Sequence, residues 1–331
     1  MFWLSRWKAK RTLTDKKAYA CRQSSGAPGR TISRGIMPGK VEISMEYEDK
    51  ELYLREQIVL AGKRLLETGL VARTWGNVSA RLSDTEFIIT PSGRDYETTK
   101  PEDLVKMNIY DLSYDASGLK PSSEHGLHAA CYRLRPDVNF VIHTHQFYAS
   151  VVCADLKDVT YAGADFEDVT VPCARYAMPG TKKLWINVEN AVRLCPDSSE
   201  FLMARHGALV LAPSYEEAFR RAEELEEACR AKFIKRVPEA AEIAKPEDGN
   251  APKADFSRLY GALYGKAPVY LDDYAMMTPV NYDVDDEEAL HMVTEKNAAA
   301  ALYAKDARPM GRFDAFKQHR SYVKRYSKLK Y

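Results

Sequence analysis

The stretch VNFVIHTHQF, Val138 to Phe147, decides the fold and raises the question of function. Its apolar, β-branched first half predicts a buried strand, and two histidines follow at the end of that strand. Residues i and i+2 of a strand project from one face about 7 Å apart, so His143 and His145 can converge while Thr144 turns away. A His-x-His pair alone is more often an ordinary hydrogen-bonded pair than a pair of metal ligands, so other residues must decide.

Size and charge exclude several classes of protein. The 331 residues can bury a sizeable core in one large domain or two, and the formal net charge of +1 gives no sign of a nucleic-acid partner. No apolar run approaches the roughly 20 residues that span a bilayer, so we expect no membrane partner. Six scattered cysteines without a Cys-x-x-Cys motif predict reduced thiols in the cytoplasm and no disulfide framework.

Composition divides the chain into three parts. Residues 1–49 are basic and poor in periodic apolar residues, which predicts a disordered N-terminal extension. A transit peptide, or a true start at Met37 or Met45, would fit this composition equally. Residues 50–244 carry globular patterns, and residues 245–331 form a linker followed by a tyrosine-rich, partly helical C-terminal extension.

Periodicity and end signals place the main elements. We expect helices over residues 51–70, 121–135, 214–234 and 285–306. We expect strands over residues 85–93, 138–147 and 200–212, the last interrupted at Arg205 to Gly207, and irregular structure with one short strand over residues 155–181. No G-x-G-x-x-G follows a strand, which disfavours a dinucleotide-binding fold.

The histidines crowd into one region. Five of the seven fall between Pro121 and Gly207. His206 also interrupts an apolar strand, and Glu124 in a first helical turn can supply a carboxylate beside His143 and His145. Three imidazoles and one carboxylate suit Zn²⁺, with Mn²⁺ or Co²⁺ as alternatives. His125 and His128 are interpreted as structural or supporting residues.

Ser122 and Ser123 stand at the N-terminus of the same helix. Serines there cap backbone N–H groups, which is a sufficient explanation, but the same hydroxyls, amides and helix dipole also bind phosphate. The turns at residues 90–93 and 76–79 offer further small donors of the kind that ordinary turns contain.

Five motifs follow one another in the chain: TWGNVSAR (74–81), ITPSG (89–93), KPSSEHGLH (120–128), VIHTH (141–145) and ARHGALVLA (204–212). Together they resemble the class II aldolase/adducin family over residues 52–233, with L-fuculose-phosphate aldolase and L-ribulose-5-phosphate 4-epimerase as the members most alike. The resemblance implies a three-layer α/β/α fold around a mainly antiparallel sheet. It also implies a homotetramer with active sites between subunits.

The resemblance also implies roles for individual residues. His143, His145 and His206 match the zinc ligands, and Glu124 matches a metal ligand that becomes the catalytic acid/base when substrate displaces it. The positions that match the family's phosphate-binding residues are Asn77, Ser92, Gly93, Ser122 and Ser123. The activity implied is zinc-dependent retro-aldol cleavage of a ketose phosphate to dihydroxyacetone phosphate and an aldehyde.

Three alternatives stay open. An epimerase is disfavoured by Glu124, where family epimerases carry Asp, but Asp165 stands at the spacing of their catalytic aspartate. An adducin-like interaction module would lack the histidines, and a metal hydrolase would not need the phosphate-type turns.

A tyrosine from a neighbouring subunit donates a proton in the fuculose enzyme. Its position here holds Ala164, with Tyr161 nearby. The tyrosines of the C-terminal extension could close the active site or merely pack: Tyr260, Tyr264, Tyr270 and Tyr274.

Overall fold

The structure is a computed structural model, and it describes residues 47–71, 75–163, 167–244, 255–266 and 287–305, together with 316, 317 and 320. The predictions for the N-terminal extension before residue 47 and for the linker at 245–253 fall outside these residues. The same is true of Ala164, Asp165, Tyr270 and Tyr274.

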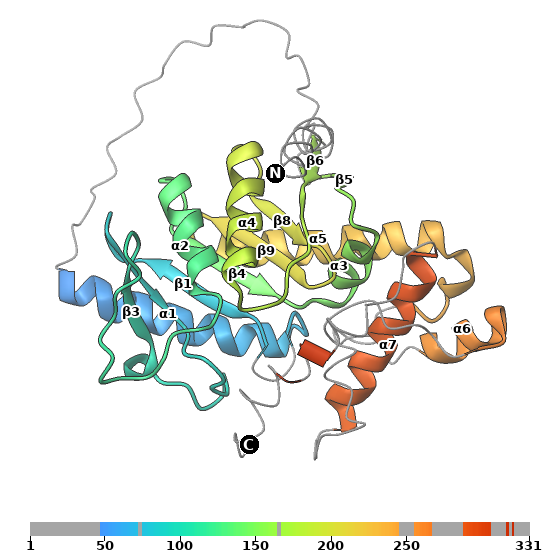
Figure 1. Cartoon of the computed structure of the whole chain (residues 1–331), viewed down its shortest axis with the longest axis horizontal. Coiled ribbons are helices and arrows are strands. Elements are labelled where there is room, and N and C mark those ends of the chain that lie inside the picture. The colour runs from blue at the N-terminus through green and yellow to red at the C-terminus, as the bar shows by residue number, and fades with distance from the viewer. Residues whose placement is uncertain are drawn as a thin grey trace, which may run out of the picture.

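A seven-stranded sheet forms the centre of the molecule, in the order β3-β2-β1-β4-β9-β8-β7 (Figure 1). All its pairings are antiparallel except β7 with β8. The strands are β1 (Asn77–Arg81), β2 (Glu86–Ile89), β3 (Val105–Asn108), β4 (Phe140–Thr144), β7 (Cys173–Ala174), β8 (Glu200–Met203) and β9 (Gly207–Ala212).

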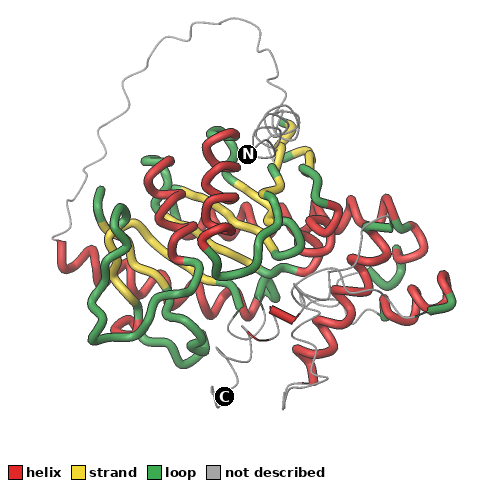
Figure 2. The backbone as a smooth tube through the Cα atoms, in the orientation of Figure 1, coloured by secondary structure: helices red, strands yellow, loops and turns green. Residues whose placement is uncertain are grey.

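Helices cover both faces of the sheet, which confirms the predicted α/β/α layers (Figure 2). One face packs against α1 (Tyr47–Glu67) and α5 (Tyr215–Arg236), the other against α2 (His125–Leu134) and α4 (Lys182–Leu194). Alternation along β4 assigns the faces, because Ile142 packs in the α1/α5 cluster and Val141 in the α2/α4 cluster. His143, two residues after Val141, therefore faces the layer of α2.

A third apolar cluster lies beside the sheet and contains α3 (Phe147–Val152), α6 (Phe256–Tyr264) and α7 (Glu287–Tyr303) packed on α5. Figure 1 shows α6 and α7 together at the right of the molecule. The helical part of the C-terminal extension is thus built into the core.

The prediction for residues 155–181 was wrong in part. The segment holds β5 (Val159–Ala162) and β6 (Asp168–Val171), which form a separate two-stranded sheet, as well as β7. Short β-branched runs at both ends of the Gly163 turn explain this hairpin, since Thr160 faces Thr170 across it. Residues 200–212 form two strands, β8 and β9, joined by a turn where the sequence predicted an interruption.

Local signals set the helix ends. Ser214 caps α5, because Glu217 N donates to its hydroxyl at 3.3 Å, as the capping-box pattern predicts. By contrast α2 begins at His125, so the predicted serines precede it in a turn. Short 3₁₀ turns are η1 (Pro101–Asp103), η2 (Cys153–Asp155) and η3 (Pro238–Ala240). Among the described residues, no helix has the length and apolarity to cross a membrane.

Candidate metal centre

Three buried histidines meet at one point. His143 lies near the end of β4, His145 follows β4 directly, and His206 lies in the turn between β8 and β9. Each offers a ring nitrogen within 4.8 Å of the others, and the ring centroids are 4.6 to 4.9 Å apart. The pair predicted on one strand face and the third histidine from a distant motif are therefore brought together.

The turn that carries His206 is shaped by two neighbouring residues. Arg205 has a left-handed backbone with φ of 56°, which reverses the chain between the strands. A Cβ on Gly207 would lie 2.2 Å from the backbone oxygen of Thr144, so only glycine lets β9 approach β4 here. This close approach holds His206 over the end of β4.

The tautomer of His143 follows from its contacts. Its Nδ1 lies 2.8 Å from the carbonyl oxygen of Ala208 and must donate, because a carbonyl can only accept. Its Nε2 faces the cluster, where His145 Nε2 lies 2.9 Å and Glu124 Oε2 3.2 Å away. A backbone carbonyl that fixes the tautomer in this way is the usual support of a metal-binding imidazole.

Glu124 completes the donor set from the turn before α2. Its Oε1 lies 3.5 Å from His206 Nε2 and, among the described residues, receives no hydrogen bond. Burial alone would raise the pKa of Glu124, but His143, His206 and the amide of Asn77 outweigh it and hold the pKa below its ordinary value. The result is a buried carboxylate facing imidazole nitrogens.

Burial keeps the imidazoles of His145 and His206 neutral. It lowers the pKa of His206 to about 4 and places the pKa of His145 well below its ordinary value. Neutral imidazole is the form that binds metal, and three of them beside a carboxylate are a catalytic donor set. The residues present therefore fit a divalent ion such as zinc.

Behind Glu124 runs a buried hydrogen-bonded chain. Asn77 Nδ2 donates to Glu124 Oε2 at 3.0 Å, and Asn77 Oδ1 makes a short contact with His128 Nε2. His128 Nδ1 lies 2.7 Å from the hydroxyl of Ser79, which lies 2.7 Å from the hydroxyl of Tyr132. The chain begins at the site and ends inside the α2 layer.

This hydrogen-bonded chain was not predicted as a unit, although the residue spacing that forms it can be seen in the sequence. His128 and Tyr132 share one face of α2, and Glu124, the N-cap residue, stands four residues before His128, while Asn77 and Ser79 are two apart on β1. Two matching periodicities could have indicated the pairing; what the sequence lacks is the information that this helix face meets this strand.

The predicted phosphate-binding positions lie in two adjoining turns. Ser92 N donates to Lys120 O at 2.9 Å and Ser122 N to Thr90 O at 3.1 Å, so the turns are paired as a short β-bridge. This bridge pairs Pro91 with Pro121 and so brings the backbones of Ser92 and Ser122 close together, and Gly93 and Ser123 follow them in the two turns. The side-chain amide of Asn77 lies between Glu124 and His128.

Three of the tyrosines considered as proton donors or as closing groups lie in the described residues: Tyr161, Tyr260 and Tyr264. Tyr161 donates to Glu200 at 2.7 Å, Tyr260 is buried in the cluster of α3, α6 and α7, and Tyr264 is exposed. No proton donor is identified among them.

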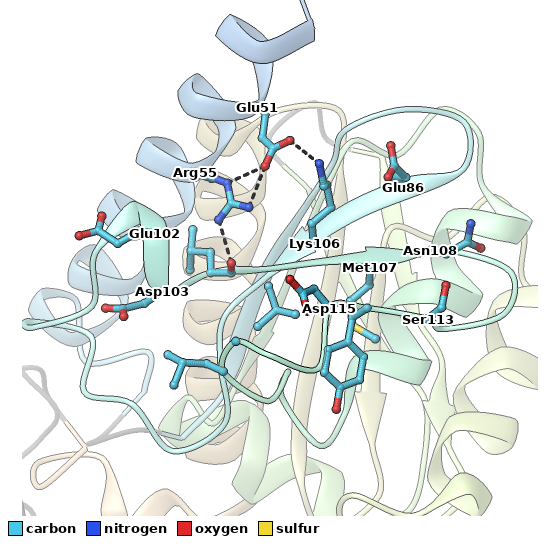
Figure 3. A pocket seen from close by; sticks show the side chains of 15 residues that line it. Glu51, Arg55, Glu86, Glu102, Asp103, Lys106, Met107, Asn108, Ser113 and Asp115 are labelled. Carbon is cyan, nitrogen blue, oxygen red and sulfur yellow. Dashed lines mark hydrogen bonds and ion pairs between the residues drawn. The ribbon is translucent and has the colours of Figure 1, made fainter.

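A pocket of about 590 Å³ lies elsewhere, between α1 and the edge strand β3 (Figure 3). Its charged groups already serve the fold: Arg55 donates to the carbonyls of Pro101 and Leu104, and Glu51 accepts from Arg55 and Lys106. Because these contacts join α1 to the sheet edge, the pocket is a structural recess apart from the histidine cluster.

Comparison with known proteins identifies the family of this chain. Residues 56–233 match the profile of the class II aldolase and adducin N-terminal domain. The chain is similar to 5-deoxy-D-ribulose 1-phosphate aldolase of Bacillus thuringiensis, with 38% identity over 52% of this chain and 80% of the relative.

It is also similar to the probable L-ribulose-5-phosphate 4-epimerase UlaF of Mycoplasma pneumoniae, with 34% identity over 37% of this chain and 52% of the relative. The solved structure of an L-fuculose 1-phosphate aldolase superposes with a TM-score of 0.50 and 29% identity, covering 59% of this chain and 91% of that one. The chain belongs to the class II aldolase and adducin family.

Proposed function

We propose that the protein is a metal-dependent aldolase that cleaves a ketose 1-phosphate to dihydroxyacetone phosphate and an aldehyde. The observation that carries the proposal is the position of Glu124, whose two oxygens lie 3.2 Å and 3.5 Å from the ring nitrogens of His143 and His206. A carboxylate held there can bind the same ion as the imidazoles or serve as a base beside it.

His143, His145, His206 and Glu124 would hold a divalent ion. Bound there, the ion would supply Lewis-acid stabilisation of the negative charge that develops when the bond between C3 and C4 breaks. Glu124 would serve as the acid/base beside the ion, and the hydrogen bond from Asn77 keeps its carboxylate in place.

The paired turns beside α2 would hold the substrate phosphate. Hydroxyls of Ser92, Ser122 and Ser123, backbone amides at Gly93 and the positive end of α2 are the groups that bind phosphate in other proteins. Holding the phosphate there would fix the distance between the sugar carbons and Glu124. Asn77 is included in this group only through the family motif.

The epimerase alternative is supported by the similarity to UlaF. Glu124 favours cleavage, because the resemblance places Asp at this position in epimerases. A non-catalytic, adducin-like role is disfavoured because the whole histidine set is present and assembled.

The deciding experiment measures dihydroxyacetone phosphate released from a panel of ketose 1-phosphates, including 5-deoxyribulose 1-phosphate and fuculose 1-phosphate, with ribulose 5-phosphate in parallel. We expect release that a chelator abolishes and zinc restores. Conversion of ribulose 5-phosphate to xylulose 5-phosphate without any release would contradict the aldolase and establish the epimerase.

We also propose a cytoplasmic homotetramer with active sites between subunits, as the family resemblance implies. Light scattering coupled to size-exclusion chromatography tests the assembly. A monomer with full activity would contradict the shared sites.

A further inference from the structure

The residue that follows the second histidine of the site is held by contacts with β4 and α5. Gln146 is fully buried, and its side chain accepts from Thr144 at 2.7 Å and donates to the carbonyl of Ala222 in α5 at 3.1 Å. The next two backbone amides, of Tyr148 and Ala149, donate to the carboxylate of Glu226 in α5 at 2.7 and 3.0 Å. The chain after His145 therefore has little freedom to move.

His145 itself is held at both ends of its backbone. Its N–H donates to the carbonyl of Leu70 at 3.1 Å, and its carbonyl oxygen accepts from Nζ of Lys296. Lys296 belongs to α7, 151 residues further along the chain. A side chain of the C-terminal extension thus contacts the backbone of a histidine of the candidate metal centre.

Lys296 is completely buried, which is rare for lysine and requires compensating contacts. Nζ lies 5.9 Å from the ring centroid of Phe147, and the charge of Lys296 acts on the nearby carboxylate of Glu226. Burial raises the pKa of Glu226, while the amides of Tyr148 and Ala149 and the charge of Lys296 oppose that rise. Lys296 and Glu226 thus hold the start of α3 from opposite helices.

The part of α7 that carries Lys296 belongs to the core. Every residue from Glu295 to Ala304 is buried, and a helical segment buried on all faces lies inside a protein. Glu295 accepts from the backbone N–H of Ser257 at 3.0 Å, which joins α7 to the start of α6. All these residues lie outside the matched family domain, which ends at residue 233.

We propose that Lys296 is a positioning residue for His145, and that the C-terminal extension of this chain is therefore required for tight metal binding. Through the carbonyl of His145, Lys296 fixes the backbone from which the imidazole projects toward His143 and His206. Loss of a group that orients a metal ligand costs about 10- to 100-fold in metal affinity. The proposal rests on the metal site of the proposed function.

The test compares full-length, metal-free protein with Lys296→Met, which keeps the length and apolar stem but removes the donor. Zinc affinity is measured by competition with a chromophoric chelator, and Co²⁺ is added to record the visible spectrum that reports ligand geometry. We expect Lys296→Met to raise the zinc Kd about 10-fold or more and to change the Co²⁺ spectrum. Lys296→Arg, which retains donors, should recover part of the affinity.

Leu302→Ala is the matched control, because Leu302 is fully buried in the same helix and the same cluster, six residues after Lys296. It should lower Tm and leave the zinc Kd and the Co²⁺ spectrum unchanged. If Lys296→Met is unfolded by circular dichroism, Lys296→Leu, which also lacks a donor, takes its place.

The possible outcomes separate the two proposals. Wild-type affinity in a folded Lys296→Met protein would overturn the role of Lys296 and leave the metal site intact. Loss of affinity in Leu302→Ala equal to that in Lys296→Met would reduce the contact to general stability and overturn the positioning role. A wild-type protein that binds zinc no better than His206→Ala would overturn the metal site itself.

Discussion

Asn77 donates a hydrogen bond of 3.0 Å to Glu124, and the rest of the buried chain fixes the direction of that bond. Because Nδ2 faces the carboxylate, Oδ1 must face His128, whose Nε2 then carries a proton. Burial lowers the pKa of His128 to about 3, so the ring is neutral and its Nδ1 accepts from Ser79. His128 therefore prevents the side-chain amide of Asn77 from flipping, which would exchange its Nδ2 and Oδ1.

The first prediction concerns this orientation. His128→Phe keeps a ring but removes the donor to Asn77, so Glu124 loses its fixed partner and kcat should fall, by up to about 100-fold. His128→Gln, which can still donate to Asn77, should retain more activity. Steady-state kinetics on the best ketose phosphate of the panel measure both.

Tyr132→Phe provides the control for this series. It removes the hydroxyl at the far end of the chain and leaves Ser79 able to donate to His128. An activity loss as large as that of His128→Phe would show that the hydrogen-bonded chain stabilises the core rather than orienting Glu124.

The second prediction concerns the ligands. Replacement of His143, His145 or His206 with Ala should abolish metal retention and cleavage together, since each contributes one of three converging nitrogens. Metal content by mass spectrometry and product release on the same samples provide the measurement. A variant that keeps full activity without its imidazole contradicts the site.

Gly207 gives the third prediction. In Gly207→Ala the new methyl group meets the backbone oxygen of Thr144 at 2.2 Å, so the turn that carries His206 must shift. We expect a loss of about 1–3 kcal/mol in the free energy of unfolding, with weaker zinc binding. Gly118→Ala is the matched control, since its methyl group would meet nothing closer than 3.8 Å. Equal urea midpoints for the two variants would argue against a tight turn.

The fourth prediction is a pH dependence at Glu200, a buried carboxyl on β8 that accepts from Tyr161. Burial raises the pKa of Glu200 to about 7 from its ordinary 4.5, so the folded state holds a proton that the unfolded chain releases. Its contribution is full below pH 4.5 and lost as the pH rises through 7. Each pKa unit corresponds to about 1.4 kcal/mol.

Glu200→Gln removes this titration and keeps an acceptor for Tyr161. The Tm of the variant minus the Tm of the wild type should therefore increase as the pH is raised from 5 to 8. Parallel Tm curves over that range would show that Glu200 does not titrate there.

The sequence predicted best what depends on local pattern. The His143–His145 pair, the cap of α5 at Ser214 and the apolar runs of β4 and β9 are all set by residues within a few positions of one another. The layered fold and the convergence of His206 came from the order of the motifs, which encodes contacts that no single motif contains.

What the sequence did not predict depends on contacts between distant segments. α4 has a local signal, the cap at Thr181, that was not used. By contrast, nothing near Lys296 marks it as a partner of His145, because lysine in a helix is normally exposed and the contact spans 151 residues. The hairpin of β5 and β6 is likewise stabilised by pairing across a turn rather than by a long periodic run.

The cysteines of the described residues are all buried, and they divide between two of the apolar clusters: Cys153, Cys173 and Cys229 with α3, α6 and α7, and Cys131 and Cys195 between α2 and α4. Burial raises the pKa of Cys229 and Cys173 well above the ordinary value, so neither reacts while its cluster is closed. The native chain thus carries its own reporters of local opening. Pulsed alkylation read peptide by peptide can follow release of the C-terminal helices separately from unfolding of the α2 and α4 layer, without any engineered cysteine.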